Sequence, residues 1–207
     1  MRDTAKASPS SHDQLTPKEP HPVAFVLLLL YGLRRGETLG IRWSDIDLDA
    51  GTIHVRQQLQ RISGELRLGP VKTSAGRRDL PLLDIASQAL KLQAERQAAY
   101  CADMGSAWPA TELVFTTRTG RPIEPRNFVR SFRRICENNN IRIIKVHHVR
   151  HTIGSLLKDL RIPARDAQAI LGHARISTTL EIYTDTDDQA RRQALTQLHG
   201  LLDDGQN

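Results

Sequence analysis

The sequence KVHHVRHTIGSLLKDL, residues 145–160, decides the fold of the C-terminal half. Its apolar residues return at helical spacing and form one stripe, made of Val149, Ile153, Leu156, Leu157 and Leu160. A helix that opens near His147 places His147 and Arg150 about 60° apart, on a flank that faces away from this stripe. An arginine and a histidine at a helix N-terminus suit a bound phosphate. A helix start that is merely basic and a zinc site formed by His147 and His151 are the alternatives.

Helical patterns continue on both sides of this segment. An apolar run bounded by Pro22 and Gly32 predicts a buried helix over 21–33, and a single apolar stripe over 128–136 predicts a helix with one buried face. Residues 85–104 are rich in Ala, Gln and Glu and predict a helix with Asp84 as its N-cap. The C-terminal part is predicted to form further helices over residues 166–171, 178–183 and 187–202. A Thr and a Glu three residues apart give the second of these the spacing of a capping box.

One small sheet is predicted on the N-terminal side. A turn cluster at 47–51 precedes a segment with strand character, which predicts a three-stranded antiparallel meander with strands at 52–61, 65–68 and 77–82. A further short strand is expected at 113–116. Residues 1–20 are polar, contain several Pro, Ser and Thr, and are expected to be a mobile leader. The predicted fold class is therefore α+β and mainly helical.

The charges are unevenly distributed along the 207 residues, whose net charge is +6. Residues 56–78 and 118–150 together hold fifteen basic and three acidic side chains, a net charge of +12, so the rest of the chain is net −6. A segregated basic surface suits a phosphate backbone. An aromatic content of 4% disfavours platforms that stack single-stranded bases, so duplex DNA is the predicted partner. A solvated basic face without a partner is the alternative.

Membrane and secretory classes fit the sequence poorly. The long apolar run, residues 23–31, is too short to span a bilayer and is followed by arginines rather than by a cleavage site. Cys101 and Cys136 lie far apart without the spacing of metal ligands, so neither a disulfide framework nor a cysteine-rich zinc site is indicated. No membrane partner is expected, and a reducing cytoplasm is the default location.

Three further segments could carry chemistry. Arg34 lies between two glycines in GLRRGE, and Lys72, in GPVKT, lies at the rim of the predicted meander. The segment LGH, which ends at His173, is followed ten positions later by Tyr183. A tyrosine hydroxyl can attack phosphorus where cations stabilise the developing charge. The alternatives are a basic helix end, a solvated turn lysine and a tyrosine at the boundary of the core.

Together these segments resemble the catalytic domain of the tyrosine recombinases, the phage-type integrases. The resemblance runs from about Leu27 to Thr184 and follows the family's order of an Arg box, a hairpin Lys, an H-x-x-R-H box, an L-G-H box and a Tyr. In this chain the boxes read YGLRRGETLGIRWSDID, GPVKTSAGRRDLPL, HHVRHT and LGHARISTTLEIYT. The resemblance implies the tyrosine recombinase catalytic-domain fold over residues 21–203. The separate N-terminal core-binding domain, which closes a clamp around DNA in full-length relatives, is expected to be absent.

The resemblance assigns six catalytic residues, namely Arg34, Lys72, His147, Arg150, His173 and Tyr183. It implies that Tyr183 attacks the scissile phosphate, leaving a 3′-phosphotyrosyl bond and a free 5′-hydroxyl. The two arginines would hold the non-bridging oxygens, and Lys72 would protonate the leaving 5′-oxygen. His147 would assist proton transfer at the nucleophile, and His173 would hydrogen-bond the phosphate. Because these cations compensate the anionic phosphorane, no metal ion and no other cofactor is expected.

Site-specific DNA recombination or integration, by DNA strand cleavage and rejoining, is the function that this resemblance implies. The alternatives are a non-catalytic DNA-binding remnant of an integrase and a DNA-relaxing activity of the type IB topoisomerase kind. Expected partners are double-stranded DNA, three further copies in a homo-tetramer on paired DNA sites, and accessory DNA-bending or excision factors. The amphipathic segment 187–202 is the candidate for contact with a neighbouring copy, with packing inside its own chain as the alternative.

The chain departs from the family pattern at two positions near the proposed site. Residue 148 is His where the family usually has Asp, and residue 31 is Tyr where Thr is common. Neither departure removes a residue type that the chemistry needs. His151 matches the family's second histidine of the H-x-x-R-H box, where a packing role is expected.

Overall fold

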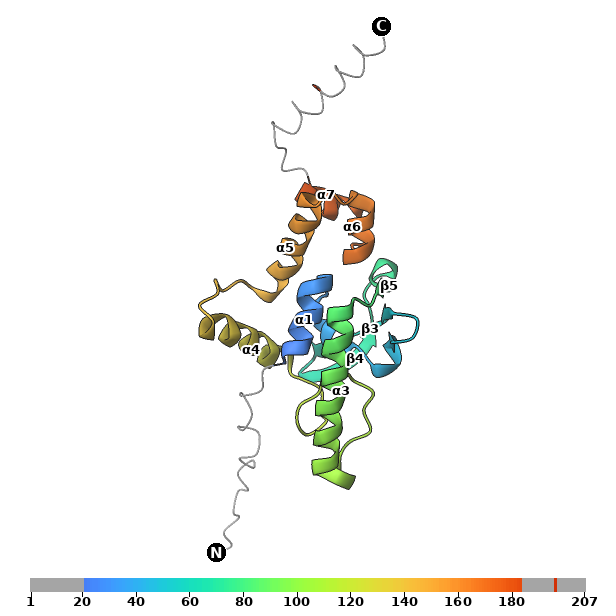
Figure 1. Cartoon of the computed structure of the whole chain (residues 1–207), viewed down its shortest axis with the longest axis vertical. Coiled ribbons are helices and arrows are strands. Elements are labelled where there is room, and N and C mark those ends of the chain that lie inside the picture. The colour runs from blue at the N-terminus through green and yellow to red at the C-terminus, as the bar shows by residue number, and fades with distance from the viewer. Residues whose placement is uncertain (1–20, 184–195, 197–207) are drawn as a thin grey trace, which may run out of the picture.

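The computed structural model describes residues 21–183 and residue 196, and it confirms a mainly helical α+β fold with a small antiparallel sheet (Figure 1). The predicted leader at 1–20 and the predicted helix at 187–202 lie outside the described residues. The α-helices are α1 (Pro22–Tyr31), α2 (Arg35–Gly40), α3 (Asp84–Met104), α4 (Pro125–Asn138), α5 (Val146–Asp159), α6 (Ala164–Leu171) and α7 (Ile176–Tyr183). Short 3₁₀ turns occupy Trp43–Asp45, Ser74–Gly76 and Gly105–Ala107.

Helix α1 forms the centre of the fold because it is apolar on almost every side. Ala24, Leu27 and Leu28 are completely buried, and the helix packs against both α3 and α5. It ends at Gly32, whose φ of +57° is a left-handed conformation that glycine adopts without a steric penalty. Within residues 21–183, no helix combines the length and the apolar character that a membrane crossing requires.

The sheet differs from the predicted meander. The strands are β1 (Ile46–Asp47), β2 (Thr52–Val55), β3 (Gln57–Ile62), β4 (Glu65–Pro70) and β5 (Arg78–Pro81). Strand β2 lies between β1 and β5 in an antiparallel three-stranded sheet, whereas β3 and β4 pair with each other as a separate hairpin. A small antiparallel sheet is thus confirmed, but the prediction of one meander through all three segments is wrong.

The break between β2 and β3 falls at Arg56, and long-range contacts explain it. The Arg56 guanidinium donates to the carbonyl of Arg78 over 3.0 Å, and the Arg56 carbonyl accepts a hydrogen bond from the backbone N–H of Val71 over 3.3 Å. Arg56 therefore joins the two pairs of strands instead of continuing one of them. The strand expected at 113–116 is also absent, since Leu113 and Thr116 form only isolated bridges, with Arg42 and Pro122 respectively.

Both predicted helix caps are wrong, by a single residue at α3 and by more at α7. The N-cap of α3 is Leu83, whose N–H donates to the Tyr31 hydroxyl over 3.0 Å, and Asp84 is the first residue of the helix. In that position the Asp84 carboxylate still complements the positive end of the helix dipole. Helix α7 begins at Ile176, so Thr178 lies inside the helix rather than at its cap.

Helices α5, α6 and α7 form a group at one end of the described chain (Figure 1). They contact one another, and α5 also packs on α1. Gly154 on α5 allows α7 to pack closely, since an added Cβ there would lie 2.7 Å from the Cδ1 atom of Ile182. These helices carry the H-x-x-R-H box, the L-G-H box and the Tyr. The contacts of α5 with α1 and of α6 with β5 bring them toward the Arg box and the hairpin Lys.

An aromatic cluster joins α4 to α1. Phe128 is completely buried, and its ring centroid lies 4.5 Å from that of Phe25, which also contacts the ring of Phe132 at 5.4 Å. The apolar stripe predicted for α4 is therefore the face that packs into the core.

Replacing Phe128 with Ala should lower the free energy of unfolding by about 3–5 kcal/mol, because the substitution leaves a cavity beside Phe25. Urea denaturation followed by circular dichroism measures this change. The matched control is Ile141→Ala, whose side chain is 57% exposed and whose loss should change the free energy by less than about 0.5 kcal/mol. Equal losses in the two variants would contradict this account of the core.

Candidate active site

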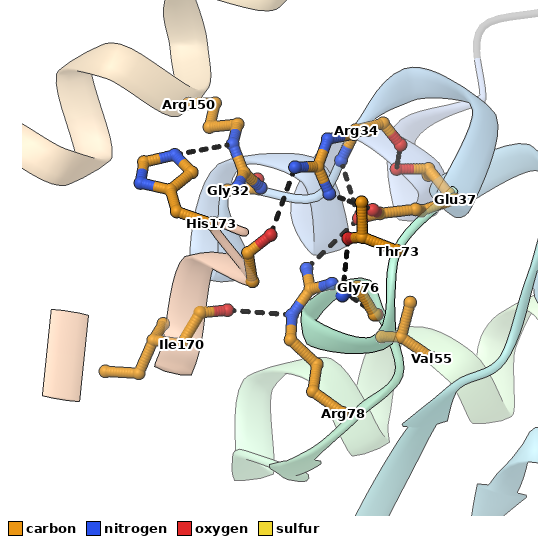
Figure 2. A network of polar contacts seen from close by, with 12 residues as sticks. Gly32, Arg34, Glu37, Val55, Thr73, Gly76, Arg78, Arg150, Ile170 and His173 are labelled. Atoms are coloured by element: carbon orange, nitrogen blue, oxygen red, sulfur yellow. Dashed lines mark hydrogen bonds and ion pairs between the residues drawn. The ribbon is translucent and has the colours of Figure 1, made fainter. Parts of the chain in front are cut away.

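Arg34 lies just after the turn that ends α1 and forms hydrogen bonds with two other segments of the chain. Its backbone N–H and its Nη1 atom donate to the two carboxylate oxygens of Glu37, over 3.0 Å and 2.6 Å. Its Nη2 atom donates to the carbonyl of Gly172 over 3.0 Å. Gly172 follows the last residue of α6, so Arg34 satisfies a carbonyl that the helix itself leaves without a partner. Figure 2 shows these groups together.

Arg150 approaches the same space from α5. Its Nη1 atom donates to the carbonyl of Gly32, at the end of α1, over 2.9 Å, and its Nε atom donates to the Nε2 atom of His173 over 3.2 Å. The Nη2 atom of Arg150 is buried and has no hydrogen-bond partner; among the described residues it is the one buried side-chain nitrogen or oxygen in that state. Burial and the neighbouring Arg34 lower the pKa of Arg150 to about 9, so the group stays charged at pH 7. A buried cationic donor without a partner is suited to bind an anion.

His173 is buried between α5 and α7 and is neutral. Since its Nε2 atom accepts from Arg150, its hydrogen lies on Nδ1, which donates to the Thr179 hydroxyl over 2.9 Å. Burial first, and then the charge of Arg150, lower the pKa of His173 to about 4. Thr179 is completely buried on α7, so this hydrogen bond fixes the orientation of the ring.

Glu37 and Arg78 belong to the same group, and the sequence analysis did not identify them. Both are buried, with 1% and 8% of their surface exposed, and the Nη2 atom of Arg78 donates to the Glu37 carboxylate over 3.1 Å. Burial alone would raise the pKa of Glu37, but Arg78 and Arg34 together outweigh burial and hold that pKa below its usual value. The carboxylate is therefore ionised, and the guanidinium groups of Arg34 and Arg78 both bind it.

Signals for both residues are present in the sequence. Glu37 stands three residues after Arg34, the spacing at which side chains share a helix face. Arg78 alternates in β5 with the buried Leu80, and the strand period places both side chains on the inward face. The period of β5 separates Arg78 from Arg77, which is exposed.

Three of the predicted catalytic residues, Arg34, Arg150 and His173, are brought together in this group. Lys72 is exposed in the turn after β4, and His147 is exposed at the start of α5. The His147 ring lies 4.2 Å from the His148 ring, and burial followed by the nearby His148 and Lys145 lowers the pKa of His147. His151 is exposed, so the packing role expected for it is wrong.

Tyr183 lies apart from the arginines. Its hydroxyl donates to the carbonyl of Ile162 over 3.0 Å, in the connection between α5 and α6. Arg150 is near the start of α5 and Ile162 is beyond its end, so the two are separated by at least about 14 Å along the helix axis. Burial raises the pKa of the Tyr183 hydroxyl.

The charges of this group define its chemistry. The guanidiniums of Arg34, Arg78 and Arg150 and the carboxylate of Glu37 leave a net charge of +2 beside a neutral imidazole. Such a group stabilises an anion and the extra negative charge of an anionic transition state. Within the described part of the chain, no group of three or more His, Cys, Asp and Glu side chains is placed to hold a metal ion.

Comparisons with known proteins agree with this geometry. The family model described as "Phage integrase family" matches residues 10–190. A protein named tyrosine recombinase XerC-like, from Caldanaerobacter subterraneus subsp. tengcongensis, is 28% identical over 190 residues, which are 86% of this chain and 49% of that protein. Tyrosine recombinase XerC of Xylella fastidiosa is 31% identical over 159 residues, or 76% of this chain and 46% of XerC. The chain thus spans about half the length of these curated relatives.

Solved structures show the same fold. The Tn1549 transposon integrase in complex with transposon right-end DNA superposes with a TM-score of 0.74 at 25% identity, covering 86% of this chain and 59% of that one. The XerA recombinase superposes with a TM-score of 0.60 at 26% identity, over 84% of this chain and 56% of XerA. Since the family model covers most of the sequence, this chain belongs to the phage integrase family.

Proposed function

We propose that this chain carries out site-specific DNA recombination by cleaving and rejoining double-stranded DNA through a 3′-phosphotyrosyl intermediate. The observation that carries the proposal is the buried, unpartnered Nη2 atom of Arg150, which lies in a group of net charge +2. A phosphate oxygen of DNA is the anion that this donor would hold. The Tn1549 integrase, which shares the fold, is solved with transposon DNA bound.

The proposed chemistry uses the six residues identified from the sequence. The Tyr183 oxygen attacks the phosphorus, the bond from phosphorus to the 5′-oxygen breaks, and Lys72 donates a proton to that leaving oxygen. His147 accepts the proton of the tyrosine hydroxyl. Arg34 and Arg150 hold the non-bridging oxygens, and His173 donates a hydrogen bond to one of them. The phosphotyrosyl bond keeps the energy of the ester, so a second DNA 5′-hydroxyl can reverse the step.

Two rearrangements are part of this proposal. Tyr183 must leave the carbonyl of Ile162 to reach the phosphate that Arg34 and Arg150 hold. Arg150 must also release the Nε2 atom of His173 if the ring is to donate from that atom. The Thr179 hydroxyl can then donate to Nδ1 instead of accepting from it, because a hydroxyl has both capacities.

DNA binding and assembly complete the proposal. Arg126, Arg130 and Arg133 are exposed on α4, opposite the face that packs into the core, and would contact the phosphate backbone of a duplex. Assembly of four copies on two DNA sites, and direction by accessory DNA-bending or excision factors, belong to the same proposal. Residues 21–203 would form the catalytic domain.

A non-catalytic DNA-binding role is the second candidate, and the position of Tyr183 favours it. A protein whose tyrosine stays on the Ile162 carbonyl would bind duplex DNA in a salt-dependent way and form no covalent product. The type IB topoisomerase-like alternative would instead relax supercoiled plasmid that carries no specific site.

Replacing Tyr183 with Phe should abolish covalent attachment to DNA, because the attacking oxygen is removed. The wild-type chain is incubated with a mixture of nicked duplexes of varied sequence, from which the short strand downstream of the cut diffuses away and traps the adduct. Denaturing electrophoresis then detects protein bound to labelled DNA. Tyr100→Phe is the matched control, since Tyr100 lies on α3 and its hydroxyl accepts from Arg96. An adduct in the Tyr183→Phe variant would refute the proposed nucleophile.

Replacing Lys72 with Met should lower the rate of adduct formation on ordinary DNA by about 100-fold, because the general acid is lost. On DNA with sulfur in place of the leaving 5′-oxygen, the loss should be less than about tenfold, since a thiolate leaves without being protonated. Single-turnover rates on the two substrates measure the difference. Lys91→Met, an exposed change on α3, should leave both rates unchanged. An equal loss on both substrates would show that Lys72 is not the acid.

A further inference from the structure

We propose that Arg78 is the positioning residue that holds the Lys72 turn, Arg34 and His173 in one fixed arrangement. The inference rests on the proposed function and deepens it, because it names a residue through which three of the proposed catalytic groups are aligned. Arg78 lies at the start of β5, on the inward side of the strand.

The guanidinium of Arg78 bonds three separate segments of the chain. Its Nη1 atom donates to the carbonyl of Gly76 over 3.0 Å, its Nη2 atom donates to the carboxylate of Glu37 over 3.1 Å, and its Nε atom donates to the carbonyl of Ile170 over 2.9 Å. Figure 2 shows Arg78 below Arg34, with its bonds to Ile170 and to Glu37 drawn as dashed lines. Each nitrogen of the side chain is engaged, and only 8% of the residue is exposed.

The bond to Gly76 reaches the turn that follows Lys72. This 3₁₀ turn, Ser74–Gly76, begins two residues after Lys72 and is closed by the Thr73 hydroxyl, which accepts from the N–H of Gly76 over 3.2 Å. Lys72 itself is exposed and adjoins that cap. The hydrogen bond from Arg78 therefore fixes the backbone of the turn, which restricts the position of the Lys72 Cα atom next to it.

The other two bonds reach Arg34 and His173. Glu37 receives Arg78 on the oxygen that also accepts the N–H of Arg34, so the same carboxylate orients both arginines. Ile170 lies at the end of α6, three residues before His173. A Cβ added at Gly172 would lie 2.8 Å from the Nη1 atom of Arg78 and 2.8 Å from the carbonyl oxygen of Ala75. The α6 end, the turn and Arg78 are thus in direct contact.

Arg78 acts on these groups and not on the phosphate. Arg34 has 40% of its side chain exposed and Arg150 has an unpartnered nitrogen, whereas each nitrogen of Arg78 already has an acceptor and only 8% of the residue is exposed. Lysine cannot replace it in this role, because an ammonium on a flexible stem lacks the planar fork that reaches three acceptors at fixed angles. A simple buried ion pair with Glu37 would need only one of the three bonds.

The experiment compares Arg78→Lys with the wild type on the two DNA substrates, one with the ordinary leaving oxygen and one with sulfur in its place. If Arg78 positions Lys72, the ratio of the sulfur rate to the oxygen rate should rise about tenfold, because the sulfur substrate does not need the acid. A defect of folding alone would lower both rates equally and leave the ratio unchanged. Arg77→Lys, an exposed change at the neighbouring residue, is the matched control and should keep the wild-type ratio.

A second variant and a second readout keep the outcomes distinct. Arg78→Met should raise the ratio at least as far, and amide hydrogen exchange should quicken at residues 73–77 and 170–173 in both variants. If Arg78→Met does not fold, Arg78→Lys, which keeps the charge beside Glu37, decides the question. An unchanged ratio in Arg78→Lys, with a wild-type adduct present, overturns the positioning role alone. No adduct from the wild type under any condition overturns the proposed function and, with it, the role of Arg78.

Discussion

The structure depends on guanidinium groups bound to the carbonyl ends of two helices. Helix α1 ends at Gly32, whose carbonyl accepts from Arg150, and α6 ends near Ile170 and Gly172, whose carbonyls accept from Arg78 and Arg34. The last carbonyls of a helix have no partner within it and carry the negative end of its dipole, so cationic donors are favoured there. The contacts are reciprocal, because Arg34 follows the end of α1 and reaches α6, while Arg150 lies on the α5 side and reaches α1. The same arginines therefore dock the C-terminal helices onto the rest of the fold and line the site.

This arrangement leaves positive charge unbalanced inside the protein. Arg34 and Arg78 share the ionised carboxylate of Glu37, whereas Arg150 binds only the Gly32 carbonyl and the neutral His173 ring, which has no further acceptor to offer. Burial and, after it, the nearby charge of Arg34 lower the pKa of Arg150, so both the loss of solvent and like-charge repulsion raise the free energy of the folded chain. An anion bound at the Nη2 atom of Arg150 would relieve that repulsion, so the folded chain itself would contribute to the affinity for the proposed phosphate.

Much of this could be predicted from the sequence, because local patterns fix helices and motifs. The apolar stripe of α4 and the all-apolar α1 are properties of single segments, and Arg34, Arg150 and His173 stand in recognisable boxes. The stripe predicted for α5 is only partly buried: Val149 is in the core, whereas Leu156 and Leu160 are exposed. The break at Arg56 is different, since it arises from bonds to residues of β5 and of the turn after β4, which no local period records. Arg78 and Glu37 were missed for a related reason, since charged residues are usually exposed. In β5, only the two-residue period that Arg78 shares with the apolar Leu80 indicates that Arg78 points inward. The resting place of Tyr183 on the Ile162 carbonyl likewise depends on how α7 packs.

The acceptors at the helix ends are all main-chain atoms, and this has a consequence for how the sequence can vary. A substitution at Ile170 changes the side chain but leaves the carbonyl that binds Arg78 in place. At Gly32 and Gly172 the constraint is instead the positive φ and the lack of room for a Cβ, independent of any polar group. The side chain at an acceptor position such as 170 can therefore change without loss of the hydrogen bond. The donor positions, in contrast, require arginine, and positions 32 and 172 require glycine. A different residue at position 170 would thus keep the same electrostatic arrangement at the end of α6.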